Sequence, residues 1–235
     1  MKQLVLLHGW GASERLWQRQ VAVFGEEYPV LAPSIPAWKA AWLEEYLTRL
    51  PLEETVLVGW SLGGMLLVEA LGQIAGPAAA ATVLVGVAPV FCQRPGHPWG
   101  QSVASVRAMR LGLRSDPTRV LTGFLASCLA PGEESFRDEA AAGCDFAADP
   151  AHLALLSQGL DYLRDKDLCG SLPHLRGPVA IIQGEEDGIV DPAQAQFLHE
   201  HLWGSSLHLI SGAGHLPFLT QAQAFNGILM DLLGT

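Results

Sequence analysis

The sequence predicts an α/β fold: an open, mostly parallel sheet of about six strands with helices on both faces. Short apolar runs recur along the 235-residue chain, and the segments between them have the apolar spacing of helices. Strands that alternate with helices pair in parallel and are covered on both faces. Three of the apolar runs lead into chemically reactive side chains, which indicates an active site at one edge of the sheet.

The expected strands are apolar runs of the kind that suits buried strands of a parallel sheet. The first run ends in the tight turn His8-Gly9-Trp10-Gly11, and Pro33 and Pro36 break the chain after the second. The expected strands are residues 3–7, 28–32, 55–59, 82–87, 178–183 and 206–210.

The expected helices combine apolar spacing with residues that begin or end helices. Ser13 is expected to cap the first helix, and Asp116 to cap another that has Pro117 in its first turn. Gly76-Pro77 is expected to close the helix after Ser61. Helices are expected at residues 14–24, 37–50, 62–74, 101–113, 150–163, 192–202 and 221–233, with one opening at 115–117.

Residues 89–176 show no strand pattern and fall between the fourth and fifth expected strands. This segment therefore has to lie outside the sheet. We expect a core formed by residues 1–88 and 177–235, with residues 89–176 inserted as a helical lid before the strand that leads to Asp187.

Composition argues against several classes of protein. A hydrophobic content of 49% and a charged content of 16% are typical of a globular protein, and no apolar run is long enough to span a membrane. A net charge of −10 argues against nucleic acid and anionic membrane surfaces as partners. The apolar run at the start of the chain is too short for a signal peptide. The four cysteines are widely spaced, with no Cys-x-x-Cys pair. We expect free thiols and a cytoplasmic protein.

The pattern Gly59-Trp60-Ser61-Leu62-Gly63 lies between an expected strand and an expected helix. In that context Gly-x-Ser-x-Gly is typical of a nucleophile elbow, in which a sharp turn exposes the serine hydroxyl at the start of the helix. Glycines on either side let the strand and helix approach closely. A serine in a glycine-rich turn without chemistry is the alternative.

A serine nucleophile needs a base and a group that orients the base. Asp187 and His215 each follow a later strand, so the chain order is Ser…Asp…His, and all three fall at the same edge of the sheet. We expect Ser61, Asp187 and His215 to form a catalytic triad. Glu185, Glu186 and Asp191 are rival orienters, and Asp191 remains open as the acid.

The oxyanion of such a reaction requires backbone N–H donors. One is expected from Leu62, directly after the nucleophile, and the other from Trp10 in the turn after the first strand. We expect His8 in the same turn to be structural.

These motifs resemble the α/β-hydrolase family. The likeness extends over nearly the whole chain and rests on His8-Gly9-Trp10-Gly11, Gly59-Trp60-Ser61-Leu62-Gly63-Gly64, Gly184-Glu185-Glu186-Asp187 and Gly214-His215. The first two motifs and segments 123–126 and 159–165 are similar to the pimeloyl-[acyl-carrier protein] methyl ester esterases of biotin synthesis. That resemblance implies a serine carboxylesterase that removes methanol from a pimeloyl methyl ester held on acyl-carrier protein, through an acyl-enzyme.

The chain departs from the family pattern at two places. The usual antiparallel pair before the first strand is missing, so six strands are expected. Residues 32–38 replace the loop Asp-x-x-Gly-x-Gly-x-Ser after the second strand, and this replacement is expected to reshape one wall of the substrate pocket.

The expected lid is rich in arginine. Residues 94–132 hold five arginines and one acid, a net charge of +4 that leaves −14 for the remainder. Arg107, Arg110 and Arg114 have the spacing of one helix face, and Arg119 and Arg137 are further candidates for contacts with acidic acyl-carrier protein. An ordinary solvated helix face is the alternative.

Apolar residues of the same segment are candidates for an acyl tunnel. Phe124, Leu125 and Leu129 have helical spacing and are considered together with Trp10 and Trp60; Trp10 and Phe124 are the preferred substrate contacts. Packing of the lid against the sheet is the alternative.

Two other functions remain open. One is a general short- or medium-chain carboxylesterase, or a hydrolase of carbon–carbon bonds, with the same triad. The other is a non-catalytic ligand receptor on this fold, because fold alone does not fix function. The sequence has no nucleotide-binding glycine pattern and no metal-ligand spacing, so we expect no cofactor and no metal. We expect a monomer.

Overall fold

A computed structural model describes residues 2–147 and 149–234 of the chain. Six strands form one sheet in the order β2-β1-β3-β4-β5-β6, and every neighbouring pair is parallel. The strands are β1 (Gln3–Leu7), β2 (Val30–Leu31), β3 (Thr55–Trp60), β4 (Ala81–Val85), β5 (Val179–Gly184) and β6 (Ser206–Ile210). Every residue of the three strands β3, β4 and β5 is buried, as in sheets covered on both faces. The predicted parallel α/β sheet is confirmed.

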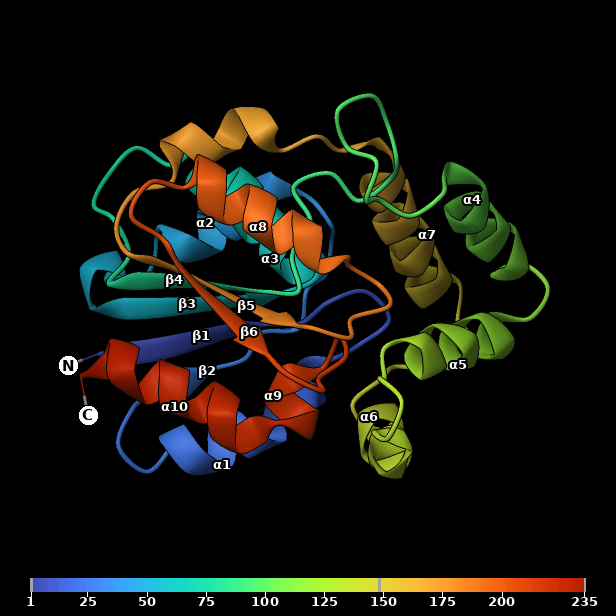
Figure 1. The fold of residues 1–235 in the computed structure, drawn as a ribbon, viewed down its shortest axis with the longest axis horizontal. Coiled ribbons are helices and arrows are strands. Elements are labelled where there is room, and N and C mark those ends of the chain that lie inside the picture. The colour runs from blue at the N-terminus through green and yellow to red at the C-terminus, as the bar shows by residue number, and fades with distance from the viewer. Residues whose placement is uncertain (1, 148, 235) are drawn as a thin grey trace.

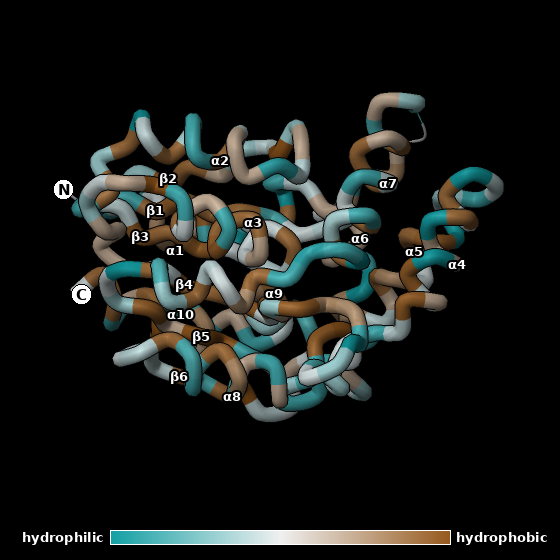
Figure 2. The backbone as a smooth tube through the Cα atoms, turned by 90° about the horizontal axis from the view of Figure 1, so that it is seen from above, coloured by the Kyte–Doolittle hydropathy of each residue, from teal (hydrophilic) through white to brown (hydrophobic). Residues whose placement is uncertain are grey.

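Helices cover both faces of this sheet (Figure 1). One face carries α2 (Ala40–Leu47), α3 (Leu62–Leu71) and α8 (Pro192–His201), and the other carries α1 (Gln18–Phe24) and α10 (Ala222–Leu233). Successive side chains of each strand point to opposite faces of the sheet and pack into two separate hydrophobic cores, one under each layer of helices. Figure 2 shows hydrophobic stretches gathered in the strands and in α3, at the centre of the molecule.

The element boundaries differ from the predicted ones where local contacts compete. Ser13 does not cap a helix: its hydroxyl donates to the carbonyl of Gly143 at 3.1 Å, and α1 begins only after a 3₁₀ turn at Glu14–Trp17. The α3 helix ends at Leu71, earlier than expected, because the N–H groups of residues 73 and 74 both turn back to the carbonyl of Ala70. Further 3₁₀ turns occupy Leu52–Glu54, Glu134–Phe136 and Cys169–His174.

Four helices lie between β4 and β5: α4 (Val103–Gly112), α5 (Pro117–Ser127), α6 (Arg137–Ala142) and α7 (Pro150–Asp165). As predicted, Asp116 caps α5 by accepting the N–H of Arg119 at 2.9 Å, and Pro117 stands in the first turn. The α6 helix and the one-turn α9 (Pro217–Thr220) were not predicted. Figure 1 shows α4 to α7 grouped beyond one end of the strands, away from the chain termini.

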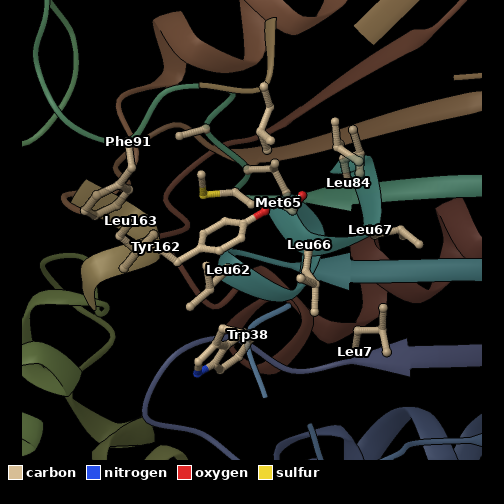
Figure 3. Close-up of a cluster of buried hydrophobic side chains, with 14 of the residues drawn as sticks. Leu7, Trp38, Leu62, Met65, Leu66, Leu67, Leu84, Phe91, Tyr162 and Leu163 are labelled. Carbon is tan, nitrogen blue, oxygen red and sulfur yellow. Dashed lines mark hydrogen bonds between the residues drawn. The ribbon is translucent and has the colours of Figure 1, made fainter. Parts of the chain in front are cut away.

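The α7 helix is one of the parts of this inserted segment that are bonded to the core. The Tyr162 hydroxyl donates to Oε2 of Glu69 on α3 at 2.6 Å, and the indole N–H of Trp10 donates to the Leu156 carbonyl at 2.8 Å. Figure 3 shows Tyr162 and Leu163 reaching from α7 into the side chains of α3 around Leu62 and Met65. Residues of the turn after β1 and of α3 therefore both hold α7 in place.

Within the described residues no helix has the length and apolarity needed to cross a bilayer. The same residues contain no group of three or more His, Cys, Asp or Glu side chains arranged to hold a metal ion. All four cysteines are free thiols.

Candidate active site

Ser61 occupies a strained turn between β3 and α3. Its φ is +53°, and it is the single non-glycine residue with positive φ in the described part of the chain. The turn needs glycine because a Cβ on Gly63 would stand 2.2 Å from the His8 carbonyl oxygen, and one on Gly59 would stand 2.5 Å from Cα of Gly64. The hydroxyl is thereby held at the N-terminus of α3, where developing negative charge is favoured.

A chain of hydrogen bonds links Ser61, His215 and Asp187. The Ser61 Oγ lies 2.9 Å from Nε2 of His215, and Nδ1 of the same ring lies 2.7 Å from Oδ2 of Asp187. Ser61 follows β3, Asp187 follows β5 and His215 follows β6. The parallel sheet therefore brings Ser61 and His215 together although they are 154 positions apart in the sequence. His215 is fully buried, and Ser61 is 7% exposed. In this arrangement an imidazole can accept the hydroxyl proton while a carboxylate fixes its tautomer.

The Asp187 carboxylate is held by four donors. Besides His215, Gln183 Nε2 donates to Oδ2 at 2.9 Å, and the N–H groups of Ile189 and Val190 donate to Oδ1 at 2.8 and 2.9 Å. Burial raises the pKa of Asp187, but the charge and hydrogen bond of His215 and the two backbone N–H groups outweigh it and keep the pKa below its ordinary value. The ionised form is therefore favoured, and the stability it adds is present above pH 3.8 and is lost as the pH falls through the lowered pKa.

The rival acids lie elsewhere. Asp191 caps α8 by accepting the N–H of Ala193 at 2.8 Å. Glu185 and Glu186 are exposed. Of the four acids considered from the sequence, the structure brings only Asp187 against the His215 ring.

The two backbone N–H groups predicted to be oxyanion donors have no hydrogen-bond partner among the described residues. Leu62 is the first residue of α3, and Trp10 lies in the turn after β1; both are buried, and no hydrogen bond among the described residues uses either N–H. The neighbouring His8 has another task, because its Nε2 accepts the N–H of Ile35 at 3.2 Å while Nδ1 bonds the Gly9 carbonyl at 2.9 Å. Burial lowers the pKa of His8, which favours the neutral ring that this pair of bonds requires.

The His215 ring and backbone are fixed by residues of β3 and of the turn after β4. The indole N–H of Trp60 donates to the His215 carbonyl at 2.8 Å. Gly86 has a φ of +55°, and a Cβ there would stand 2.9 Å from the His215 Nδ1. The ring therefore fills space that a larger residue at position 86 would occupy.

A cavity of about 530 Å³ lies mainly among α4, α5 and α7 of the inserted segment and meets the core at Trp10, Gly188 and Ile189. Trp10 and Phe124 both line it, with their rings 5.0 Å apart in an edge-to-face contact. Ser61 itself is not part of this wall; Trp10 and the residues just after Asp187, Gly188 and Ile189, connect the cavity to the triad. The other tunnel candidates, Trp60, Leu125 and Leu129, are not part of this wall; they pack with the hydrophobic core that α1 and α10 cover.

The arginines do not form the single helix face expected. The α4 helix ends at Gly112, so Arg114 lies beyond it, and Arg110 is drawn inward to Asp161 of α7, with Nε and Oδ1 2.8 Å apart. Arg107, Arg114, Arg119 and Arg137 are exposed. Figure 1 shows α6, which carries Arg137, well apart from α4. The net charge of residues 94–132 gave no sign of the pairing between Arg110 and Asp161, because Asp161 lies on α7, outside that range.

Sequence analysis missed three residues that shape the site. Gln183 is the last residue of the expected strand at 178–183, Gly86 follows β4, and Glu133 lies in the inserted segment. A buried glutamine in the strand before the acid, and a glycine after the strand between nucleophile and acid, are the signals that point to the first two. Nothing in the local sequence distinguishes Glu133 from its exposed neighbour Glu134.

Three features together are typical of alpha/beta hydrolases: the strained serine turn, the Ser–His–Asp arrangement after parallel strands, and the helical insertion. The profile of the alpha/beta hydrolase family matches residues 4–228, and the chain belongs to that family. Two relatives are pimeloyl-[acyl-carrier protein] methyl ester esterases: that of Methylococcus capsulatus is 31% identical over 99% of this chain and 95% of its own, and that of Aromatoleum aromaticum is 28% identical over 98% and 97%. Among solved structures, an esterase from Exiguobacterium antarcticum superposes with a TM-score of 0.84 at 25% identity, covering 100% of this chain and 92% of its own.

Proposed function

We propose that the chain is a serine carboxylesterase that hydrolyses the methyl ester of a pimeloyl group carried on acyl-carrier protein. The hydrogen-bonded chain from Ser61 through His215 to Asp187 is the observation that carries the proposal of ester hydrolysis. Ser61 Oγ attacks the ester carbonyl carbon, and Nε2 of His215 takes the hydroxyl proton. Asp187 stabilises the imidazolium that results.

The tetrahedral intermediate puts its negative oxygen between the N–H groups of Trp10 and Leu62. One such donor typically lowers the barrier by about 3 kcal/mol. When the intermediate collapses, His215 returns the proton to the departing methoxide, which leaves as methanol, and the acyl group remains on Ser61. Water then attacks the acyl carbon with His215 as base, and the acid is released as Ser61 regains its proton.

Two observations support the carrier-bound pimeloyl substrate. The relatives that match nearly the full length of the chain carry that activity in their names. The cavity beside the triad is walled largely by apolar side chains, with Arg119 and Asp116 also part of its wall, so an acyl chain can lie in it with a polar group at one end. On this proposal residues 89–176 act as a lid over the core formed by residues 1–88 and 177–235.

The function can be tested by rescue. A bacterial strain that requires biotin because it lacks its methyl ester esterase is expected to grow without biotin when it expresses this chain. The Ser61→Ala variant, expressed to the same level, is expected not to support growth. Absence of rescue by the wild-type chain, together with rapid turnover of free p-nitrophenyl esters, would favour a general carboxylesterase instead.

The acidic carrier protein is proposed to meet the exposed arginines Arg107, Arg114 and Arg119. Reversing two charges by Arg107→Glu with Arg114→Glu is expected to raise KM for the carrier-bound substrate roughly tenfold, because steering and docking depend on complementary charge. Turnover of a free p-nitrophenyl ester is expected to stay unchanged. Arg110 is left intact because its reversal would break the contact with Asp161.

A matched control is the double variant Lys39→Glu with Arg49→Glu. Both residues are exposed and lie beside α2, on the core, and the change in net charge is the same. Arg49 pairs with Glu45, but both side chains are well exposed, and such a surface pair contributes little to stability. If this control raised KM as much as the arginine variant, the effect would be one of net charge, and the arginine surface would not be the docking site.

We further propose that the enzyme acts in the cytoplasm, where acyl chains on carrier protein are made. We propose that it acts as a monomer; one chain holds the complete triad, so catalysis does not require a second copy. Sedimentation at micromolar concentration measures that state directly.

A further inference from the structure

The loop that carries His215 is tied by its backbone to the inserted segment. The N–H of His215 donates to the Cys128 carbonyl at 2.8 Å, and the N–H of the preceding Gly214 donates to Oε2 of Glu133 at 3.1 Å. The two loops touch closely, because a Cβ on Gly214 would stand 2.6 Å from the Cys128 carbonyl oxygen and 2.9 Å from Oε2 of Glu133. The candidate base is thus held from the lid side as well as from the sheet.

Glu133 is a buried carboxylate whose side chain accepts its hydrogen bonds from backbone N–H groups of two separate loops. It is 4% exposed, and its Oε2 accepts the N–H of Ala130 at 2.8 Å as well as that of Gly214. Its Oε1 is buried without a partner among the described residues. Burying a carboxylate is costly unless its oxygens accept hydrogen bonds or pair with a cation, and the Glu133 carboxylate has two backbone N–H donors. The neighbouring Glu134 differs from Glu133. Its carboxylate is exposed and accepts the N–H of Gly132, two residues away, at 3.0 Å.

The same stretch of chain also forms the wall of the cavity. Gly123, Phe124 and Ser127 on α5 line the cavity, and Cys128 follows directly. The residues that would contact an acyl chain therefore continue, within a few positions, into the residues that hold the His215 loop.

We propose that Glu133 is a positioning residue for His215: its carboxylate clamps residues 128–133 of the inserted segment onto the His215 loop and thereby sets the place of the imidazole between Ser61 and Asp187. The inference deepens the proposed function and rests on it for its kinetic readout. It predicts that loss of the clamp lowers kcat and leaves binding of the acyl group nearly unaffected.

The test compares Glu133→Ala with Glu133→Gln. The alanine variant removes the acceptor and is expected to lower kcat for a p-nitrophenyl ester roughly ten- to hundredfold with KM unchanged, since small displacements of a catalytic group cost that much. The glutamine variant keeps one oxygen that can accept both N–H groups and is expected to restore most of kcat. Glu134→Ala, the matched control, is expected to leave kcat as it is.

A spectroscopic readout separates this inference from the proposed function. The proton shared by His215 Nδ1 and Asp187 gives a low-field proton resonance, which we expect to broaden or shift in Glu133→Ala and to remain in Glu134→Ala, whatever the substrate. Activity is expressed per folded molecule, counted by titration with a serine-reactive phosphonate. If Glu133→Ala does not fold, Glu133→Asp, whose shorter side chain falls short of Gly214, takes its place with the same expected loss.

Unchanged kcat per titrated site, or an unchanged low-field resonance, in the alanine or aspartate variant would overturn the positioning role. Failure of the wild-type chain to hydrolyse any ester, with the resonance still responding to Glu133, would instead count against the proposed function alone.

Discussion

Ser61→Ala is expected to lower kcat for ester hydrolysis by on the order of 10⁶-fold, the scale seen when the nucleophile of a serine hydrolase is removed. The hydroxyl makes its hydrogen bond to His215, and among the described residues no other hydroxyl or thiol is hydrogen-bonded to that ring. The fold is expected to persist, because the change removes one oxygen and leaves the strained backbone of the turn as it is.

The measurement is steady-state hydrolysis of the carrier-bound methyl ester and of a p-nitrophenyl ester, with thermal unfolding as the check on structure. Ser127→Ala is a suitable control: Ser127 lines the cavity, and its hydroxyl donates only to the Gly123 carbonyl at 3.1 Å. Residual turnover of Ser61→Ala within tenfold of the wild type would refute the nucleophile assignment.

Asp187→Asn is expected to lower kcat by on the order of 10⁴-fold. A neutral amide cannot stabilise the imidazolium of His215, and its NH₂ group can hold the ring in the wrong tautomer. The variant should also be less stable than the wild type, because Asp187 accepts the N–H groups of Ile189 and Val190 as an ion, and hydrogen bonds to a charged group are the stronger kind.

The matched control is Asp191→Asn, four residues further along. Asparagine is as good a helix cap as aspartate, so this variant is expected to keep both its stability and its activity. The pair of variants also decides between the two acids that the sequence left open. A large loss of kcat in Asp191→Asn with little change in Asp187→Asn would reverse the assignment.

Local sequence was sufficient to predict the sheet and to select the reactive residues. Strands β1 and β6 match their predicted residues because each ends at clear turn residues, His8-Gly9 after β1 and Ser211-Gly212 after β6. Ser61, Asp187 and His215 each follow such a run, and parallel strands bring the residues after them to one edge without any further information.

The parts that were missed depend on contacts between distant segments. Arg110 was expected to face solvent, but Asp161 of α7 draws it inward, and the pairing of α4 with α7 cannot be read from either helix alone. The hydrogen bond between Glu133 and Gly214 likewise joins residues 81 positions apart, so local sequence cannot predict it. Trp60 was considered as a tunnel residue beside the preferred Trp10 and Phe124, but the alternation of side chains along β3 puts its ring against His215, on the opposite face of the sheet from Leu57.

The central claim is that the Ser61 hydroxyl, activated by His215, removes the methyl group from a carrier-bound acyl ester. The most direct measurement is the intact mass of pimeloyl-acyl-carrier protein methyl ester after incubation with the wild-type chain and with Ser61→Ala. The account predicts that the wild type removes the mass of one methylene group from the carrier and releases one methanol per carrier, whereas the variant leaves the mass unchanged. A carrier whose mass stays constant with the wild type, or falls equally fast with Ser61→Ala, would contradict it.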